Sequence, residues 1–315
     1  MRIVFMGSAE PSVPSLEALA GSGADDVVGV VTQPDRPKGR RLRVEAGPVR
    51  AAAEKAGLRV FAPERVNLPG AVAELRALAF DVLVVVAYGQ ILKSELLGLP
   101  PLGCINVHAS LLPKYRGAAP VQWAIANGET VTGATTMFMN ERLDAGDILL
   151  QKPVAILAED TGGTLQDRLG REGAGLLVET LSRLRAGRLQ RAVQVEAGAT
   201  YAPRLRKDDG RMDWTRPAAE IANRVRGFNP WPCCFCEPAA PAGARPGFLR
   251  VLKARAEAAR AAAPGELLAA NGGGPLVAAG EGAVRLLLVQ PEGRGVMSGA
   301  DYQRGRRMAA GAAFR

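Results

Sequence analysis

Residues 81–108, DVLVVVAYGQILKSELLGLPPLGCINVH, contain two apolar runs, DVLVVVAYG (Asp81–Gly89) and GCINVH (Gly103–His108). Short apolar runs bounded by glycine or proline are typical of strands buried in a parallel sheet. The second run ends on His108, the only histidine in the chain. Because side chains alternate between the faces of a strand, Asn106 and His108 share one face. The stretch therefore predicts a buried strand that ends in two polar side chains on one side.

Strand-like and helical patterns alternate on both sides of this stretch. The strand-like runs are RIVFMG (Arg2–Gly7), VVGVVTQ (Val27–Gln33) and LRVFAP, and the helical segments are SLEALAGSG, PVRAAAEKAG and GAVAELRALAF. This alternation predicts a doubly wound, mostly parallel, Rossmann-like α/β sheet covered by helices. Ligands bind beyond the carboxyl ends of the strands in such sheets, so Asn106 and His108 are expected at the mouth of a site.

The chain is long enough for two domains, at 315 residues. Strands TTMFM and ILLQKPVAI are expected to pair across the polar loop NERLDAGD, in which Gly146 is the turn residue. A long helix over Thr164–Leu189, ended by Gly187, completes the first domain, residues 1–189. Residues 190–206 show no helical period and are predicted to be a linker.

The last part of the chain, residues 207–315, has a different pattern. One helix is expected within MDWTRPAAEIANRVRGFNPWP, and the short strand-like segments that follow are CCFCE, FLRVLKARA, GELLAA, GPLVAAG and AVRLLLVQP. Short strands separated by glycine and proline predict a small β-barrel as the second domain.

Composition favours a polyanionic partner and a cytoplasmic location. The net charge is +9 and the pI about 9.8, a balance typical of nucleic-acid binding, although an arginine-rich composition can also reflect genome bias. No apolar run is long enough to cross a membrane. The first residues enter a strand-like run directly, without the pattern of a signal or transit peptide, so we expect the protein in the cytoplasm.

Two common ligand classes are disfavoured. Cys233, Cys234 and Cys236 form a CCFC cluster without a second pair of ligands nearby, and Cys104 stands alone, so no metal site is expected. These cysteines are interpreted as small apolar residues in a reducing compartment. The turn after the first strand, GSAEPS, has one glycine where a dinucleotide-binding fingerprint needs three.

His108 is the centre of a candidate reaction site. An imidazole can exchange a proton near neutral pH, and the amide of Asn106 can bind a developing oxyanion. Asp144 and Asp147, in the NERLDAGD loop, are carboxylates that could orient the imidazole. A base, an oxyanion donor and an orienting acid suffice for transfer of an acyl group to an amine. The alternative interpretation gives these side chains structural roles only.

The loop TQPDRPKGRRLRVE (Thr32–Glu45) is the second candidate feature. It follows a strand, and its cationic residues are Arg36, Lys38, Arg40, Arg41 and Arg43. A basic loop beside a site could bind phosphates, whereas the alternative is a solvated excursion of the chain.

Together, VTQPDRP, VVVAYGQIL, GCINVHASLLPKYRGAAPVQWAI, LDAGDILLQ, AEDTGGTL and FNPWP resemble the folate-dependent formyltransferases. The basic PDRP loop, FNPWP and the small C-terminal domain make the resemblance closest to the methionyl-tRNA formyltransferase family, from Met1 almost to the C-terminus. The resemblance implies transfer of the formyl group of 10-formyltetrahydrofolate to the α-amino group of methionine on initiator tRNA. It implies no metal, and we expect a monomer.

The resemblance also assigns residues. Asn106, His108 and Asp144 match the catalytic set, with Asp144 preferred to Asp147 because it fills the first acidic place of the LDxGD pattern. The residues that match folate-contacting segments are Gln90, Ile91, Leu92, Ser110, Leu111, Leu112 and Pro113. The C-terminal domain is similar to an OB-fold-like tRNA-binding barrel.

For tRNA, the resemblance implies contacts from the basic loop, Arg40 above all, and from cationic residues of the C-terminal part. The latter candidates are Arg204, Arg206 and Lys207, followed by Arg224, Arg226, Arg250 and Lys253. The chain departs from the family pattern in GSAEPSVPSL, at Ala109 and in CCFC. A glycinamide-ribonucleotide or sugar-nucleotide formyltransferase, and a non-catalytic RNA-binding protein, are the alternatives.

Overall fold

The computed structural model describes residues 1–35, 37–38, 43–239, 247–269, 272–306, 308 and 310–315. The chain divides into two compact units. The first unit comprises residues 1–117, 131–155 and 166–202, and the second comprises residues 118–130, 156–165 and 203–315. Residues 190–202, at the start of the predicted linker, therefore group with the first unit.

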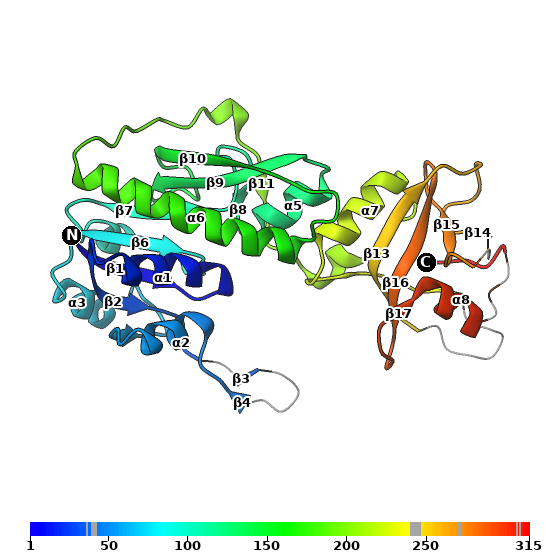
Figure 1. Ribbon diagram of the computed structural model, residues 1–315, viewed down its shortest axis with the longest axis horizontal. Coiled ribbons are helices and arrows are strands. Elements are labelled where there is room, and N and C mark those ends of the chain that lie inside the picture. Colours follow the sequence, from blue (N-terminus) through cyan, green and yellow to red (C-terminus); the bar gives the residue numbers. More distant parts are fainter. Residues whose placement is uncertain (36, 39–42, 240–246, 270–271, 307, 309) are drawn as a thin grey trace. The chain divides into compact units, whose positions relative to one another are not determined.

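The first unit is built on a seven-stranded sheet of order β10-β9-β7-β6-β1-β2-β5 (Figure 1). Its strands are β1 (Arg2–Gly7), β2 (Asp26–Val31), β5 (Val60–Phe61), β6 (Val82–Val86), β7 (Cys104–His108), β9 (Val131–Phe138) and β10 (Ile148–Ala155). The five strands from β5 to β7 pair in parallel, and β9 and β10 add an antiparallel edge. The predicted mostly parallel sheet is confirmed.

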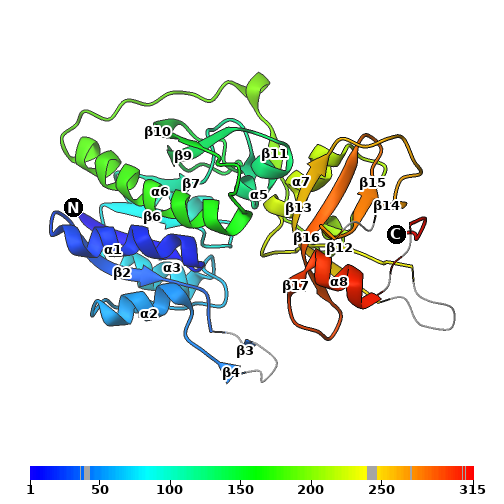
Figure 2. The same ribbon diagram turned by 45° about the vertical axis from the view of Figure 1, so that its right-hand side comes forward.

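Helices cover both faces of this sheet (Figures 1 and 2). Ile3 and Phe5 of β1 pack in one core cluster with residues of α1 (Val13–Ser22), α2 (Pro48–Lys55) and α6 (Gly162–Arg185). Val4 and Met6, on the opposite face of β1, pack in a second cluster with α3 (Pro69–Arg76) and α4 (Ser94–Leu97). Burial on both faces explains why the strands read as continuous apolar runs. The long helix α6 ends before Gly187, which has a φ of 63°.

The second unit contains an antiparallel sheet of order β12-β13-β16-β15-β14, to which β17 adds beside β16 (Figure 2). Its strands are β12 (Cys234–Cys236), β13 (Leu249–Glu257), β14 (Leu267–Ala269), β15 (Leu276–Ala278), β16 (Ala283–Pro291) and β17 (Met297–Ser298). The helices α5 (Pro120–Ala126), α7 (Ala218–Gly227) and α8 (Gly299–Arg306) belong to this unit. Trp123 of α5 meets Phe228, just after α7, edge to face at 5.4 Å.

The C-terminal residues join the two ends of the curled sheet. The peptide groups of Arg315 and Glu237, just beyond β12, exchange hydrogen bonds of 2.7 and 2.9 Å. Gly311 donates to the carbonyl of Leu267 in β14, and Phe314 donates to Gly265. Because an antiparallel sheet closed in this way leaves little exposed edge, the prediction of a small barrel-like domain is confirmed.

The remaining elements are short strands and 3-10 turns. They are the strands β3 (Pro37–Lys38), β4 (Arg43–Val44), β8 (Arg116–Gly117) and β11 (Tyr201–Ala202), and the 3-10 turns η1 (Glu10–Ser12), η2 (Glu196–Gly198) and η3 (Lys207–Gly210). None of the helices in the described parts of the chain combines the length and the apolarity needed to cross a bilayer.

Cys104, Cys234 and Cys236 are buried, as expected from their apolar surroundings, and Cys233 is partly buried. Burial raises the pKa of Cys104 and of Cys234 to about 12, so both stay protonated thiols at neutral pH. Cys233 differs from the prediction: it precedes strand β12 and has a φ of 65°. Over the described residues, no three His, Cys, Asp or Glu side chains are grouped to hold a metal ion.

Candidate active site

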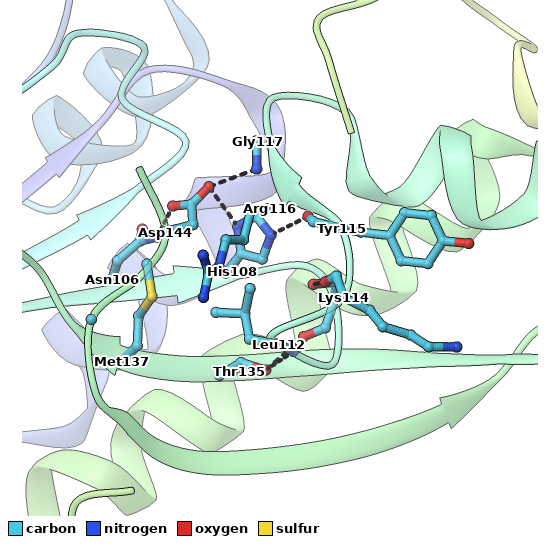
Figure 3. Close-up of polar contacts among 12 residues, drawn as sticks. Asn106, His108, Leu112, Lys114, Tyr115, Arg116, Gly117, Thr135, Met137 and Asp144 are labelled. Atoms are coloured by element: carbon cyan, nitrogen blue, oxygen red, sulfur yellow. Dashed lines mark hydrogen bonds and ion pairs between the residues drawn. The ribbon is translucent and has the colours of Figure 1, made fainter. Parts of the chain in front are cut away.

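The carboxyl end of β7 carries two polar side chains that point the same way (Figure 3). Asn106 and His108 are both buried, and only 6% of His108 is exposed. On the edge side, β9 pairs antiparallel with β7 and places Met137 beside Asn106 and Thr135 beside His108. The strand therefore fixes the position of both functional groups before any loop contributes.

The ring of His108 is oriented by a backbone carbonyl. Its Nε2 lies 2.9 Å from the carbonyl oxygen of Tyr115. A carbonyl oxygen only accepts hydrogen bonds, so Nε2 carries a proton and donates it. The other ring nitrogen, Nδ1, faces Oδ2 of Asp144 at 3.7 Å. In the neutral ring, Nδ1 is therefore the atom that can accept a proton.

Asp144 connects the two residues of β7 (Figure 3). Its Oδ2 accepts a hydrogen bond of 2.8 Å from the peptide N–H of Gly117. Its Oδ1 lies 3.5 Å from Nδ2 of Asn106. We call Asn106, His108 and Asp144 the polar corner. The carboxylate thus lies between an amide donor and an imidazole.

Two glycines allow the backbone to approach at this corner. Gly117 has a φ of 119°, and a Cβ there would lie 2.6 Å from the carbonyl oxygen of Ala202. A Cβ at Gly146 would lie 1.7 Å from the carbonyl oxygen of Phe138, because the loop after β9 turns tightly back on itself. Asp144 itself has a φ of 48°, in the left-handed region. Asp147 accepts a backbone hydrogen bond from Phe138 through its carbonyl.

The turn after β7 is held by its own polar groups. The hydroxyl of Ser110 donates to the carbonyl of Lys114 at 2.6 Å, and Thr135 donates to the carbonyl of Ser110 at 2.6 Å. The N–H of Leu112 donates to the hydroxyl of Thr135, and Leu112 is buried. Leu111 and Pro113 remain partly exposed. Within this turn, the side chains of Ser110 and Leu112 therefore serve the structure.

The segment after β6 presents one apolar side chain to solvent. Ile91 is 81% exposed, whereas Leu92 is buried. The side-chain amide of Gln90 accepts a hydrogen bond from the N–H of Val66 and donates to the carbonyl of Glu64. The side-chain amide of Gln90 is therefore already hydrogen-bonded to the segment at Glu64–Val66.

Two loops at this end of the sheet are adjacent. Ser94, at the start of α4, donates a hydrogen bond to the carboxylate of Glu141. The loop after β6 thus lies beside the loop that carries Asp144, and the exposed apolar residues Ile91 and Leu143 belong to these two loops.

The structure describes only part of the basic loop Thr32–Glu45. Arg36, Arg40 and Arg41 lie outside the described residues. Lys38 and Arg43 lie in β3 and β4, whose backbones pair antiparallel. Near the base of this loop, Asp35 accepts hydrogen bonds from the N–H of Gly47 at 2.9 Å and from Arg50 at 2.8 Å.

The cationic residues of the second unit divide into two groups. Arg204, Arg206 and Lys207 are exposed. Arg226, by contrast, donates to the carbonyls of Leu157, Ala158 and Asp160, and burial lowers its pKa. Arg226 thus has a structural role.

Arg224 also makes contacts within the second unit. Its guanidinium lies 4.9 Å from the ring centroid of Phe228, and it donates to the carbonyl of Asp209. Lys253 forms an ion pair with Glu159. Arg250 is exposed and lies 3.5 Å from the side-chain oxygen of Gln290. Arg204, Arg206 and Lys207, which are exposed and near one another in the sequence, are the candidates we retain for an external partner.

Comparison with known proteins decides the family. Residues 1–181 match the Formyl transferase family, and residues 204–307 match the Formyl transferase C-terminal domain. The chain belongs to the formyl transferase family. The methionyl-tRNA formyltransferase of Solibacter usitatus is 48% identical over 98% of this chain and 96% of its own length. That of Myxococcus xanthus is 46% identical over 98% and 96%. The family resemblance stated from the sequence is confirmed.

Solved structures of other formyltransferases share the fold. The N-formyltransferase of Helicobacter canadensis, solved with folinic acid and dTDP-3-aminofucose, aligns with a TM-score of 0.63 at 16% identity. It covers 90% of this chain and 97% of its own. Phosphoribosylglycinamide formyltransferase of Bacillus halodurans aligns over 58% of this chain and 95% of its own, with a TM-score of 0.51 at 25% identity.

Sequence reasoning missed several residues that hold the site of this formyl transferase. Arg116 and Gln194 are buried beside the loop of Asp144, and Thr135 holds the turn after β7. Arg116 lies in the quoted RGAAP motif, so its position could have been suspected. Gln194 lies in a segment without periodicity, where no local signal marks an inward-facing amide.

Proposed function

We propose that this chain transfers the formyl group of 10-formyltetrahydrofolate to the α-amino group of methionine on initiator methionyl-tRNA, for translation initiation. The observation that carries the proposal is the convergence of Asn106, His108 and Asp144 at the carboxyl end of β7. The full-length relatives named methionyl-tRNA formyltransferase support the choice of acceptor.

The polar corner supports a direct attack of the amine on the formyl carbon. As the new C–N bond forms, the formyl oxygen gains negative charge, and Nδ2 of Asn106 donates a hydrogen bond to it. The attacking nitrogen gives its extra proton to Nδ1 of His108, and Asp144 stabilises the imidazolium that results. The same proton then passes to N10 of the folate as the bond between N10 and the formyl carbon breaks. The products are the formylated amine and tetrahydrofolate.

The residues beside the corner fit a folate substrate. A pterin is a flat ring with polar edges, so it needs apolar side chains against its faces and peptide groups at its rim. Exposed Ile91 and the peptide groups of Gln90 and Leu92 can supply both. At the turn after β7, Leu111, Pro113 and the main chain of Ser110 and Leu112 are the contacts we propose.

For tRNA we propose electrostatic binding. The candidate cationic residues are Arg36, Lys38, Arg40, Arg41, Arg43, Arg204, Arg206 and Lys207. They would neutralise phosphates, which accounts for a net charge of +9. We propose a catalytic domain over residues 1–189, a linker over 190–206 and a tRNA-binding domain over 207–315. The protein would act as a monomer in the cytoplasm and without a metal.

A formylation assay tests the proposal. The protein is incubated with 10-formyltetrahydrofolate and, in parallel, with methionyl initiator tRNA, free methionine, glycinamide ribonucleotide or an amino-sugar nucleotide. We expect formylation of the charged tRNA only. Formylation of a small amine without formylation of the tRNA would support the alternative that the chain is a glycinamide-ribonucleotide or sugar-nucleotide formyltransferase. No formylation of any amine would support an RNA-binding role without catalysis.

A further inference from the structure

The connector between α6 and β11 turns one polar side chain inward. Gln194 is 8% exposed, whereas its neighbour Val193 is 80% exposed and Val195 is also exposed. Buried amides need partners, because an unpaired polar group in the interior destabilises the folded state. The direction of Gln194 therefore identifies this segment as more than a tether between domains.

The amide of Gln194 is fully hydrogen-bonded. Its Nε2 donates to the carbonyl oxygens of Asp144 at 2.9 Å and of Gly146 at 2.8 Å. Its Oε1 accepts from Nε and from one terminal nitrogen of Arg116, at 3.1 and 3.0 Å. A carboxamide has two donor hydrogens and an oxygen that accepts two bonds, so all four are used.

Arg116 is in turn held in place. It is 1% exposed, and its guanidinium forms an ion pair with Glu196 at 3.0 Å. Glu196 also pairs with Arg142, which belongs to the same loop as Asp144, at 2.8 Å. The hydrogen bond from Arg116 lowers the pKa of Glu196, so this carboxylate is charged at neutral pH. The connector thus contacts the loop of Asp144 twice, through hydrogen bonds from Gln194 and through the ion pair of Glu196 with Arg142.

The loop needs this support because of its backbone conformation. Asp144 has a φ of 48°, in the left-handed region that residues with a side chain adopt rarely unless their surroundings hold them. The carbonyls bound by Gln194 belong to Asp144 itself and to the residue two positions later. If these bonds were lost, the loop could relax, and the carboxylate would move relative to Nδ1 of His108.

We propose that Gln194 is a positioning residue of the active site. Through the carbonyls of Asp144 and Gly146, it fixes the carboxylate of Asp144 opposite His108, and Arg116 fixes Gln194. This inference rests on the proposed function for its kinetic consequence but not for its structural one. It gives part of the predicted linker, which groups with the first unit, a role in supporting the active site.

Three substitutions test the inference. Gln194→Met keeps the length of the side chain but removes all four hydrogen bonds. Gln194→Glu keeps an acceptor for Arg116 but replaces the donating NH2 by an oxygen that faces two carbonyl oxygens. Val193→Thr is the matched control, since it changes an exposed side chain of the same segment. We expect both Gln194 variants to lose about 10- to 100-fold in kcat with KM changed less than about threefold, and the control to keep its kcat.

A second measurement uses the single histidine of the chain. In 15N-labelled protein without a histidine tag, the two imidazole nitrogens give resonances from His108 alone. We expect the Nδ1 resonance to shift in Gln194→Met and in Asp144→Asn but not in Val193→Thr. If the wild-type protein formylates no charged tRNA, the proposed function fails, whereas this spectrum still decides whether Gln194 positions Asp144.

Coupling between the two residues separates positioning from general destabilisation. In an Asp144→Asn background, Gln194→Met should reduce kcat by less than about threefold further, because the group that it positions is already gone. An equal loss in both backgrounds, an unchanged Nδ1 resonance or wild-type kcat in both Gln194 variants would overturn the proposal. Loss of the cooperative unfolding transition in both variants would also overturn it, in favour of a role in folding.

Discussion

The polar corner of the first unit and the exposed cations of the second unit are both polar, but they are held differently. His108 and Asp144 are fixed by hydrogen bonds to the backbone at Tyr115 and Gly117. Arg204, Arg206 and Lys207 lie exposed to solvent. Catalysis depends on sub-ångström placement of the reacting groups, so each catalytic side chain needs hydrogen bonds that fix its position. Phosphate binding depends on summed charge, so individual positions matter less.

The largest expected effect comes from removing groups of the polar corner. His108→Ala removes the proton acceptor, and Asp144→Asn removes the charge that stabilises the imidazolium. Each should reduce the rate of methionyl-tRNA formylation by about two orders of magnitude or more. Single-turnover assays at saturating substrate measure this effect without interference from product release.

Folding controls make this result interpretable. The thermal unfolding transition of both variants should stay cooperative, because neither residue belongs to the apolar clusters of the sheet. Asp147→Asn is the matched control for the carboxylate, since the structure places Asp144 opposite the imidazole. Rates within about threefold of wild type in both corner variants would remove the polar corner from the mechanism.

The sheet could be predicted from the sequence because each of its strands is marked by a local pattern of apolar residues. Apolar runs such as Val82–Val86 and their spacing define buried strands, and the position of His108 follows from the strand that carries it. The meeting of Asp144 with His108 needed more, because 36 positions separate them, and the sequence offered Asp147 as an equal choice until the family pattern was used. The structure now gives the distances.

The support around the site was not predictable from local pattern. The partners Gln194 and Arg116 are far apart in the sequence, and an inward-facing glutamine in a polar segment looks like a solvated one. The closing of the barrel by residues 311–315 was equally hidden, because these residues lack the alternation of a long strand. Long-range hydrogen bonds of this kind appear only once the chain is folded.

The next effect concerns the exposed cations. A variant in which Arg204, Arg206 and Lys207 are all replaced by Gln should raise KM for tRNA about tenfold at physiological salt, with kcat changed little, because phosphate contacts are lost while the corner stays intact. The slope of log(kcat/KM) against log[salt] should become shallower by about 2 to 3. Steady-state kinetics at several salt concentrations measure both quantities.

A charge-matched control distinguishes local contacts from net charge. It replaces three exposed cations of the first unit by Gln: Lys55, Arg76 and Arg183. We expect this variant to keep the wild-type salt slope. Equal slopes in both triple variants would mean that the field of the whole protein, rather than the segment around 204–207, attracts the tRNA.

The smallest effect on activity is expected from an ion pair within the second unit, where a substitution should change stability. Glu257 accepts hydrogen bonds from Arg285 at 2.8 and 2.9 Å and from Arg255 at 2.7 Å. Arg285 is buried, and Glu257→Gln removes the negative charge of the carboxylate that accepts two of its hydrogen bonds. We expect the free energy of unfolding to fall by about 2 kcal/mol at pH 7, while kcat changes little.

The pH dependence of this loss gives a sharper test. Hydrogen bonds from Arg285, and then from Arg255, lower the pKa of Glu257 to about 2, against an ordinary value of 4.5. A carboxylate whose pKa is lower in the folded state stabilises the fold fully above its unfolded value and loses this effect as the pH falls. The difference in unfolding free energy between wild type and Glu257→Gln should therefore be constant above pH 5 and shrink between pH 4.5 and 2. A difference independent of pH over this range would mean that Glu257 acts through packing rather than through its charge.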